Sequence, residues 1–597
     1  MRQRLSRYYH TLRYYRPSQV FYRLLARAKH LRAPARIRRL CQEKGLRVRT
    51  FLPGIAEPVA EGPRLFLERN GVTLRLLNRF YEGPLEFRWQ ELEKRIPTRL
   101  GRFHLHYHEF FLPKFRGDDR PAPFEQIWQW IAQWISEYSL PSSPYSPDAW
   151  HPYVVSRRIP VWVKLFSLHP PDEPVAGQVL NSLTAQARWL AKNLEFDLGG
   201  NHLMQNLRAL AVAGVFFQGR EAEQWLHTVT TILPKECAEQ ILRSGEHFER
   251  CPMYHVDVLL ALADICDALQ RAAWKSGWSP EASVEKMARF LGAILHPDGQ
   301  IPLFGDSTLD LTPSPREVFA RLKLDFPNLQ PAGAQSGMVG DYWVYREGGK
   351  FLIFDTGPVG PDHLPAHAHA DLLTLEASWD GERLFVDTGV YDYEDSPERA
   401  YCRSTAAHNT LEIDGQNQCD VWSRFRMGRR GWPGVLQYDS VGPFHYAWCT
   451  HNAYRHVGCP EVRRLVLCIE NGPWLVADWV VVRGETQSAS RLHIPGEWKL
   501  CNVSESSITL ESPPSRLVIE PGSASGHTGR QGVANYFPEF ASKKPVHVLA
   551  LEAKGANILL WQIRSEDAAP AGCMVGHEMA SFTFRGHECI VFLKARS

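Results

Sequence analysis

The chain has 597 residues, 44% of them hydrophobic and 22% charged, which is a globular composition and excludes a disordered or fibrous protein. Its length allows two or more domains with separate hydrophobic cores. Because no run of about 18 apolar residues is free of interruption, we predict no membrane-spanning helix.

The first 40 residues differ from the rest of the chain in charge. They contain twelve Arg and Lys residues and no Asp or Glu, so the remainder carries −9 although the whole chain carries +3. We predict a basic helical arm over residues 1–50, which either packs on the acidic body or contacts an anionic polymer or the surface of a membrane. We expect no nucleic-acid partner. Since arginine interrupts every apolar run of the arm, we also predict no cleavable signal sequence.

The 12 cysteines are spread along the chain and form no CxxC pair. This distribution is typical of thiols that are kept reduced. Together with the expected lack of a signal sequence, it predicts a cytoplasmic location.

A helical domain is predicted next, over residues 51–330. Apolar residues recur three and four positions apart between residues 124 and 295, in runs separated by Pro, Gly and Asp clusters. Residues 40–123 have a mixed pattern and are assigned to the same domain. Successive helices without strands between them predict a bundle, a solenoid or a helical toroid.

Two helix starts in this domain carry polar side chains. Asn201 and His202 follow two glycines in GGNHLMQN, and Tyr254 and His255 open the helix of PMYHVDVLL. Such positions can present a functional group at the mouth of a helix. The alternatives are structural: Asn201 is a good helix N-cap, and a tyrosine before an apolar helix often packs at the edge of a core.

Residues 331–597 are predicted to form a β domain. The chain changes there to short runs rich in β-branched and aromatic residues, separated by Asp-Gly, Asn-Gly and Gly-Gly. Helices followed by strands indicate two domains, and this segment is long enough for a sandwich of antiparallel sheets.

The β domain contains a candidate metal site. His367 and His369 lie in HAHAD, Asp387 ends the run RLFVD, and His408 precedes the run LEI. At the strand period of two, both histidines of HAHAD point to the same side and can converge. Imidazole and carboxylate ligands suit zinc, with manganese as the alternative. If His369, Asp387 and His408 hold one divalent ion, His367 is free for another role. The alternative is that the His-x-His spacing of His367 and His369 arose by chance, since the chain has 24 histidines.

Together these segments resemble the heparinase II/III family of polysaccharide lyases. The resemblance covers roughly residues 100–440 and rests on an ordered set of segments: WHPYVVSRRIPVW, GGNHLMQNLRALAVAG, GEHFERCPMYH, IPLFGDS, HAHADLLTLEASWDGERLFVDTGVYDY and YCRSTAAHNTLEIDGQ. It implies an N-terminal α/α toroid, an incomplete helical barrel, followed by an antiparallel β-sandwich, with the substrate cleft between them.

The resemblance also implies an activity, the cleavage of a uronic-acid-containing polysaccharide by β-elimination. It implies that Asn201 with His202 neutralises the uronate carboxylate, and that Tyr254 and His367 act as acid and base. The metal ligands it implies are His369, Asp387 and His408. Candidate substrate contacts are Arg403, carried over from the family, and Arg157, Trp150 and His255.

The chemistry explains why such groups are needed. The proton on C5 lies beside a carboxylate and is poorly acidic, so donors aimed at that carboxylate should supply the largest rate effect. A tyrosine base needs its pKa lowered by a neighbouring positive charge, which His202, His255 or Arg250 could provide. We expect the ion to be structural, because a fixed His369 holds the adjacent His367 in place.

Two other function classes remain open from the sequence. A glycoside hydrolase on a similar toroid would use two carboxylates, for which Asp306, Asp371 and Glu376 are candidates. A non-catalytic protein could bind or assemble an acidic polysaccharide while the basic arm contacts a membrane. The polymer and the oligomeric state are left undecided, and so is the choice of base. If the C5 hydrogen and the C4 oxygen lie on the same face of the sugar, Tyr254 could do both jobs; if they lie on opposite faces, His367 and Tyr254 would divide them.

Overall fold

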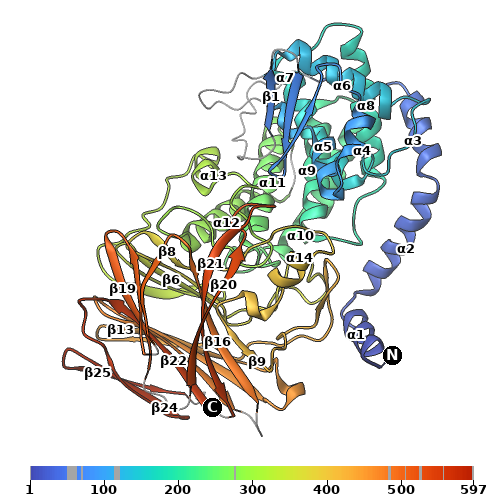
Figure 1. Cartoon of the computed structure of the whole chain (residues 1–597). Helices are drawn as coiled ribbons and strands as arrows, with labels where there is room; N and C mark the ends of the chain where they lie inside the picture. Colours follow the sequence, from blue (N-terminus) through green and yellow to red (C-terminus); the bar gives the residue numbers. More distant parts are fainter. Residues whose placement is uncertain are drawn as a thin grey trace.

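The computed structural model describes residues 2–49, 64–68, 71–112, 122–274, 277–481, 486–504, 506–522, 527–555 and 557–593. Figure 1 shows a helical half joined to a layered β half, with the N-terminal helices along one side. No helix in the described ranges has the length and apolar character needed to cross a bilayer.

The arm consists of α1 (Arg2–Leu12), α2 (Pro17–Leu31) and α3 (Ala33–Gln42). It touches both halves: Arg16 pairs with Glu239 at 2.5 Å on the helical half, and Arg7 pairs with Asp420 at 2.7 Å on the β half. The predicted end of the arm at residue 50 lies outside the described residues.

The helical half is an incomplete α/α toroid, so the fold class expected for this half is confirmed. The inner helices are α5 (Arg99–Tyr107), α7 (Pro152–Leu168), α9 (Gly200–Phe216), α11 (Pro252–Arg271) and α13 (Pro315–Leu322), and each packs on the next. The outer helices are α4 (Trp89–Arg95), α6 (Phe124–Tyr138), α8 (Val175–Ala191), α10 (Arg220–Gln240) and α12 (Glu281–Ile294). Helix α9 has 15 of its 17 residues buried, because it packs against α7, α8, α10 and α11.

A small antiparallel sheet precedes the toroid helices, in the part of the predicted helical domain whose sequence pattern is mixed. It is made of β1 (Arg64–Glu68), β2 (Gly71–Leu76) and β3 (Arg79–Gly83). The turn between β2 and β3 places Leu77 and Asn78 at φ angles of 50° and 59°. A tight hairpin turn of this kind usually has the sequence Asn-Gly. This turn has Leu-Asn instead, although leucine rarely adopts a positive φ angle.

The β half is a sandwich of antiparallel sheets, as predicted. One layer contains a five-stranded sheet, β4 (Gln335–Val339), β5 (Tyr342–Glu347), β6 (Lys350–Asp355), β7 (Leu375–Trp379) and β8 (Glu382–Phe385). Beside it lies a four-stranded sheet in the order β20 (His527–Tyr536), β21 (Lys544–Lys554), β16 (Gln487–Pro495) and β9 (Leu411–Ile413).

An eight-stranded sheet forms the second layer. Its order is β12 (Gln437–Val441), β13 (Phe444–His451), β14 (Glu461–Ile469), β15 (Trp474–Val481), β22 (Asn557–Ser565), β19 (Ser515–Pro521), β18 (Ile508–Ser512) and β17 (Lys499–Val503). Its inner face shares one core with the first layer, and its outer face packs on the three-stranded sheet of β23 (Gly572–Val575), β24 (Met579–Phe584) and β25 (His587–Phe592).

The two halves share a small hydrophobic core. Phe290 and Ile294 of α12 pack with Phe304 against Tyr342 and Phe351 of the five-stranded sheet. The loops that carry β-domain site residues, together with α14 (Pro397–Cys402), are therefore held against the inner helices of the toroid.

Candidate active site

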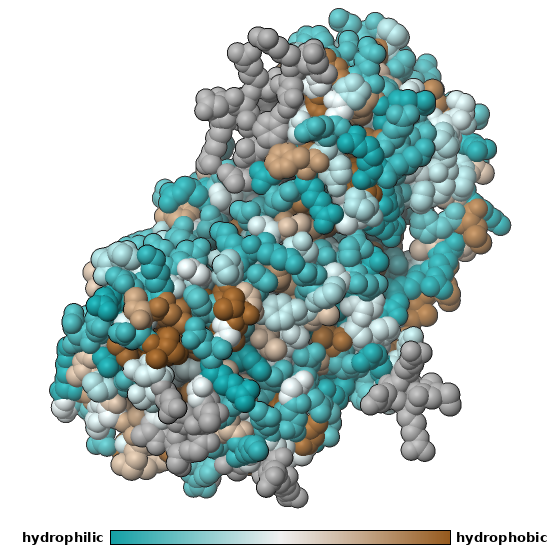
Figure 2. Space-filling model, viewed as in Figure 1, coloured by the Kyte–Doolittle hydropathy of each residue, from teal (hydrophilic) through white to brown (hydrophobic). Residues whose placement is uncertain are grey.

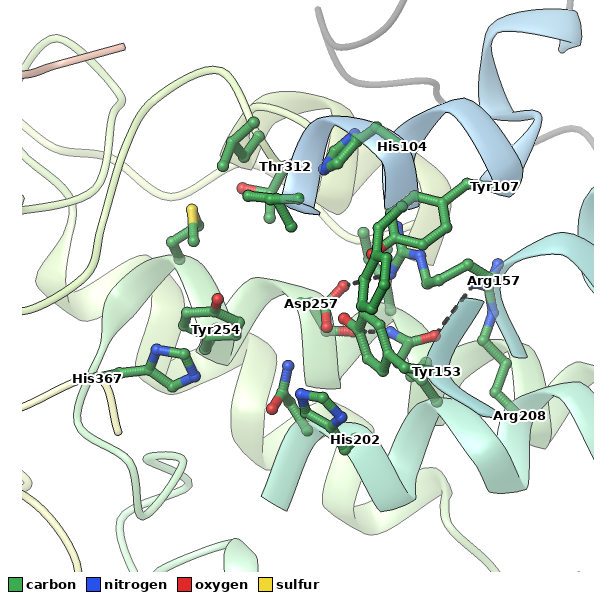
Figure 3. Close-up of a pocket in the computed structure, with 18 of the residues that line it drawn as sticks. His104, Tyr107, Tyr153, Arg157, His202, Arg208, Tyr254, Asp257, Thr312 and His367 are labelled. Carbon is green, nitrogen blue, oxygen red and sulfur yellow. Dashed lines mark hydrogen bonds and ion pairs between the residues drawn. The ribbon is translucent and has the colours of Figure 1, made fainter. Parts of the chain in front are cut away.

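A cleft of about 480 Å³ lies between the toroid and the β half. Helices α5, α7, α9 and α11 form one side, and the segments 364–367, 393–394 and 424–425 contribute from the other. In Figure 3, Tyr254 and His367 lie together at one end, with Arg157 and Arg208 at the other. Five predicted site residues line this cleft: Asn201, His202, Tyr254, His367 and Arg157.

The start of α9 places Asn201 at the cleft. Gly199 and Gly200 have φ angles of 64° and 52°, and a Cβ on Gly200 would lie 2.5 Å from Oε1 of Glu249. That close approach lets the backbone N–H of Asn201 donate to Glu249 Oε1 at 3.2 Å. Gly199 occupies the N-cap position, so the capping alternative for Asn201 is wrong.

His202 is oriented by a carboxylate behind it. Its Nδ1–H donates to Oε1 of Glu195 at 3.1 Å, and its ring lies 4.2 Å from the ring of Tyr153. Burial lowers the pKa of His202, but the negative charge of Glu195 outweighs burial and the net pKa is raised. The ring is therefore biased toward the cationic form, which suits an anionic substrate group.

Tyr254 and His367 stack on each other. Their ring centroids are 3.7 Å apart, with 25° between the ring planes. The hydroxyl of Tyr254 is 2.9 Å from that of Tyr393. Burial, reinforced by Tyr393, raises the pKa of Tyr254 well above its usual value. The lowering by positive neighbours that a tyrosine base would need is therefore not found, and the phenol keeps its proton.

Asp306 holds both histidines of the HAHAD segment. Its Oδ2 accepts from Nδ1 of His367 at 3.0 Å, and its Oδ1 accepts from Nε2 of His369 at 2.8 Å. Burial would raise the pKa of Asp306, but Arg399 and the two histidines outweigh burial and hold it well below its usual value. Because an ionised carboxylate only accepts, the Asp306-facing nitrogen of each ring carries the hydrogen.

This hydrogen bond uses Nδ1 of His367 and leaves Nε2 as its other ring nitrogen. Nε2 of His367 points to the cleft side and lies 3.5 Å from Oε2 of Glu249. Glu249 also accepts from the backbone N–H of Asn201, so one carboxyl group bridges Asn201 and His367. A close backbone approach supports the arrangement, because a Cβ on Gly305 would lie 2.8 Å from the carbonyl oxygen of His367.

The predicted metal ligands form a buried cluster behind the cleft. One potential ligand atom from each of His369, Asp387 and His408 lies within 4.8 Å of the others. Within the described part of the chain, Nδ1 of His369, Oδ1 of Asp387 and Nε2 of His408 have no hydrogen-bond partner. Buried polar atoms are nearly always paired, so an unpaired ligand atom on each of three clustered residues fits a metal ion. Two imidazoles and a carboxylate suit zinc.

Three predicted substrate contacts lie elsewhere, so the structure corrects them. Trp150 is 1% exposed and its Nε1–H donates to the carbonyl of Tyr138 at 2.8 Å. His255 is 2% exposed and bonded through both ring nitrogens to the backbone. Arg403 is 1% exposed and its guanidinium donates to the carbonyls of Ala368 and Ser423. None of the three belongs to the cleft lining, because each polar group is used to join backbone segments.

The arginines of the cleft are already paired with carboxylates. Arg157 contacts Glu109 at 2.6 Å and Asp257 at 2.7 Å, as the dashed lines of Figure 3 show for Asp257. The other arginines that line the cleft also have partners: Arg99 with Asp148, Arg208 and Arg321 with Asp264, and Arg424 with Glu394 and Asp395. Each of these arginines therefore contacts a carboxylate before any substrate binds.

The carboxylates proposed for a hydrolase are not placed for that chemistry. Asp306, Asp371 and Glu376 are buried and absent from the cleft lining. Asp306 holds two histidines, and Glu376 accepts backbone N–H groups of Leu303 and Asp387. The structure therefore removes these three carboxylates as candidates for the pair that the hydrolase alternative needs.

Sequence comparisons match both halves of the chain to one family. The model described as Heparinase II/III N-terminus matches residues 79–331, and the model described as Heparinase II/III-like, C-terminal matches residues 329–574. A heparin-sulfate lyase of Bacteroides stercoris is 24% identical over 444 residues, which are 66% of this chain and 63% of that protein. An FtsZ-localized protein C of Caulobacter vibrioides is 24% identical over 350 residues, or 56% of this chain and 58% of that protein.

A comparison with solved structures supports the fold. A crystal structure of Heparinase III superposes with a TM-score of 0.68 over 85% of each chain, at 17% sequence identity. The chain spans less than two thirds of the length of the curated relatives it matches, with 63% as the largest share.

Proposed function

The chain belongs to the heparinase II/III family, and from this premise we propose that it is a polysaccharide lyase that cleaves a uronic-acid-containing polymer by β-elimination. The observation that carries the proposal is the pairing of a neutral Tyr254 with an Asp306-held His367 in the cleft that Asn201 and His202 also line. The heparin-sulfate lyase relatives support the same reaction class.

The toroid side would stabilise the charge that develops on the substrate. Loss of the C5 proton turns the uronate carboxylate into an enediolate-like dianion. Asn201 can donate from its amide, and His202 can donate from Nε2 while Glu195 holds Nδ1. A preorganised donor of this kind is typically worth about 3 to 4 kcal/mol in the transition state.

The β side and α11 would move the protons. With Nδ1 of His367 bonded to Asp306, its Nε2 is the ring nitrogen that can accept the C5 proton. Tyr254 keeps its proton because burial raises its pKa, so it can donate to the C4 oxygen as that bond breaks. We therefore assign His367 as the base and Tyr254 as the acid, a choice that the sequence left open.

The stacking of these two rings bears on the stereochemistry. Because the ring centroids are only 3.7 Å apart, we infer that both residues reach a bound sugar from the same side. The two residues could then share a same-face elimination, which the sequence alone assigned to Tyr254. This suits uronates whose C5 hydrogen and C4 oxygen lie on one face of the ring, as in glucuronate and mannuronate. Iduronate, galacturonate and guluronate place them on opposite faces.

We further propose that the buried cluster holds one divalent ion, zinc or manganese. The ligands would be His369, Asp387 and His408, through the three donor atoms that lack partners in the described residues. When bound, the ion supplies positive charge that fixes these side chains in place. His369 in turn contacts Asp306, which orients His367, so the proposed role is structural support for the base.

The balanced charge of the cleft favours a polymer of low charge density. Each arginine in the cleft lining already contacts a carboxylate, and a densely sulfated chain would have to displace these partners. The rings of Tyr107, Tyr153 and Phe425 offer apolar surface to uncharged sugar faces. We therefore propose a polysaccharide with spaced carboxylates and little sulfate.

The free thiols support the cytoplasmic location predicted from the sequence. All twelve cysteines are unpaired, and nine of them are buried. Proteins with many unpaired cysteines are typical of reducing compartments. We propose that the protein works in the cytoplasm, which a cell fractionation can test.

The test of the function is a screen of uronate polymers by ultraviolet absorbance, since elimination creates a conjugated double bond. Unsulfated glucuronate or mannuronate polymers should give the largest signal. Tyr254→Phe should lower the rate by roughly 10²- to 10⁴-fold, whereas Tyr438→Phe, on the exposed strand β12, should leave it unchanged.

Other outcomes would contradict the proposal. New reducing ends without new absorbance would indicate hydrolysis. Binding of an acidic polysaccharide without either signal would indicate a non-catalytic binding or assembly protein. Equal rates for Tyr254→Phe and the wild type on an accepted polymer would show that the site assignment is wrong.

A further inference from the structure

We propose that the N-terminal arm binds an anionic lipid surface through one face of α2. This interaction is separate from the proposed lyase activity. The face carries Val20, Phe21, Leu24 and Leu31, whose exposed fractions are 44%, 61%, 60% and 86%, and we call these four residues the apolar stripe. Large hydrophobic residues are rarely exposed in such a row without a partner.

The spacing of the stripe places it on one side of the helix. Val20, Leu24 and Leu31 are four and seven residues apart, so they line one face of an α-helix, and Phe21 lies beside them. The other side of α2 docks on the protein body. Gln19 is buried and its amide donates to the carbonyl of His363 at 3.3 Å, while the ring of Tyr22 lies 4.9 Å from that of Phe196. The stripe therefore points away from the body.

Unpaired cations accompany the stripe. Arg27, Arg32 and Arg38 are exposed and make no ion pair within the described residues. This differs from Arg7 and Arg16, which pair with carboxylates of the body. Figure 2 shows hydrophobic residues among hydrophilic ones at the surface of the arm. An apolar face bordered by arginines is the pattern of a helix that lies in the interface of a membrane.

The combination of charge and apolar surface favours lipid over other anionic partners. A polysaccharide or a nucleic acid could pair with the arginines but would leave Phe21, Leu24 and Leu31 in water. A second copy that docked through the same stripe would bring the arginines of both arms together. An anionic bilayer takes the apolar side chains below its headgroups and pairs its phosphates with the cations.

The experiment is co-sedimentation of the full-length protein with vesicles. Vesicles of phosphatidylglycerol mixed with phosphatidylcholine should bind the protein, and vesicles of phosphatidylcholine alone should bind it far less. Added salt should weaken the binding. The double variant Phe21→Ser, Leu24→Ser should bind more than about tenfold less tightly. The double variant Arg27→Gln, Arg32→Gln should lose about fivefold for each cation.

Matched controls separate the arm from the rest of the surface. Val533→Ser and Met574→Ser remove hydrophobic side chains that are 72% and 75% exposed on the β half, and they should leave vesicle binding unchanged. Thermal unfolding should show that all variants remain folded. Turnover of a uronate polymer by the arm variants should match the wild type, so a failure of lipid binding is distinguishable from a failure of the proposed lyase activity.

Three results would overturn the proposal. They are no binding to anionic vesicles, equal binding to both kinds of vesicle, or unchanged binding by both arm variants. Light scattering tests a second copy of the chain as the partner. If the wild type does not bind vesicles and Phe21→Ser, Leu24→Ser dissociates an oligomer, the stripe is an interface between copies of the chain and the lipid assignment is wrong.

Discussion

The wall of the cleft around His367 and the buried cluster around His369 are built from one short loop, with a single residue between the two histidines. His367 stacks on Tyr254 at the cleft, whereas His369 is 0% exposed and faces Asp387 and His408. The two oxygens of Asp306 hold one ring each. Two histidines in one short loop can therefore have different roles. Substitutions at the cleft and in the buried cluster should separate the proposed proton transfer by His367 from the structural role of the cluster.

The largest expected effect is on the cleft side. His367→Ala removes the proposed base but none of the three cluster residues. Its rate on an accepted polymer should fall by roughly 10²- to 10⁴-fold, while its bound metal, measured by elemental analysis, should equal that of the wild type. His587→Ala, at an exposed position of β25, is the matched control. Loss of the metal in His367→Ala would mean that the two histidines form one site.

Asp306→Asn should damage both sides together. It leaves the buried guanidinium of Arg399 without its carboxylate, which should lower the free energy of unfolding by about 3 kcal/mol. The substitution should also lower metal affinity by about 10- to 100-fold, because the partner of His369 is lost. Asp420→Asn breaks a more exposed Asp–Arg pair and should cost less than about 1 kcal/mol in a urea titration. Similar losses of stability and of bound metal in Asp306→Asn and Asp420→Asn would contradict the idea that Asp306 links the cleft to the buried cluster.

The order of the two domains could be predicted because periodicity is a property of many residues at once. The helical spacing of residues 124–295 appears in the structure as α6 to α12, and the strand-like runs form the sheets of the sandwich. The small sheet of β1 to β3 was missed since its strands are short and its second turn uses Leu77 and Asn78. A few residues with an atypical turn leave little periodic signal.

Individual contacts were harder to predict, as two nearby arginines show. Arg399 and Arg403 are four residues apart at α14, so both lie on one side of that helix. Of the two, only Arg403 was predicted as a site residue, as a substrate contact carried over from the family. The structure places Arg399 against Asp306 and uses Arg403 to join backbone carbonyls. Which of two equivalent positions meets a carboxylate depends on tertiary packing. The roles of Glu249 and Tyr393 were missed for the same reason, since no local pattern marks their partners.

The cluster can be tested without relying on turnover. His408→Ala should purify with little or no bound ion. A chelator should lower the melting temperature of the wild type but leave that of His408→Ala unchanged. The rate should fall by about tenfold, less than for His367→Ala, because His367 and Asp306 remain. His445→Ala, at a buried histidine far along the β half in β13, should keep the ion. Equal metal content in the wild type and His408→Ala would remove the metal site from the proposal.

The far end of the cleft should give the smallest effect, and it tests whether paired arginines set the charge density of the substrate. Glu109→Gln removes one of the two carboxylates that contact Arg157 and leaves the other, Asp257, in place. The partly freed guanidinium should then bind a sulfated uronate oligosaccharide about fivefold more tightly, as expected for a charge–charge gain of about 1 kcal/mol in a partly exposed site. Affinity for the unsulfated oligosaccharide, measured by calorimetry, should change less. If both affinities rise equally, the pairing of Arg157 with Glu109 does not discriminate between the two polymers. A rise for the sulfated oligosaccharide alone would show that the paired arginines affect specificity, whereas Tyr254 and His367 affect the rate.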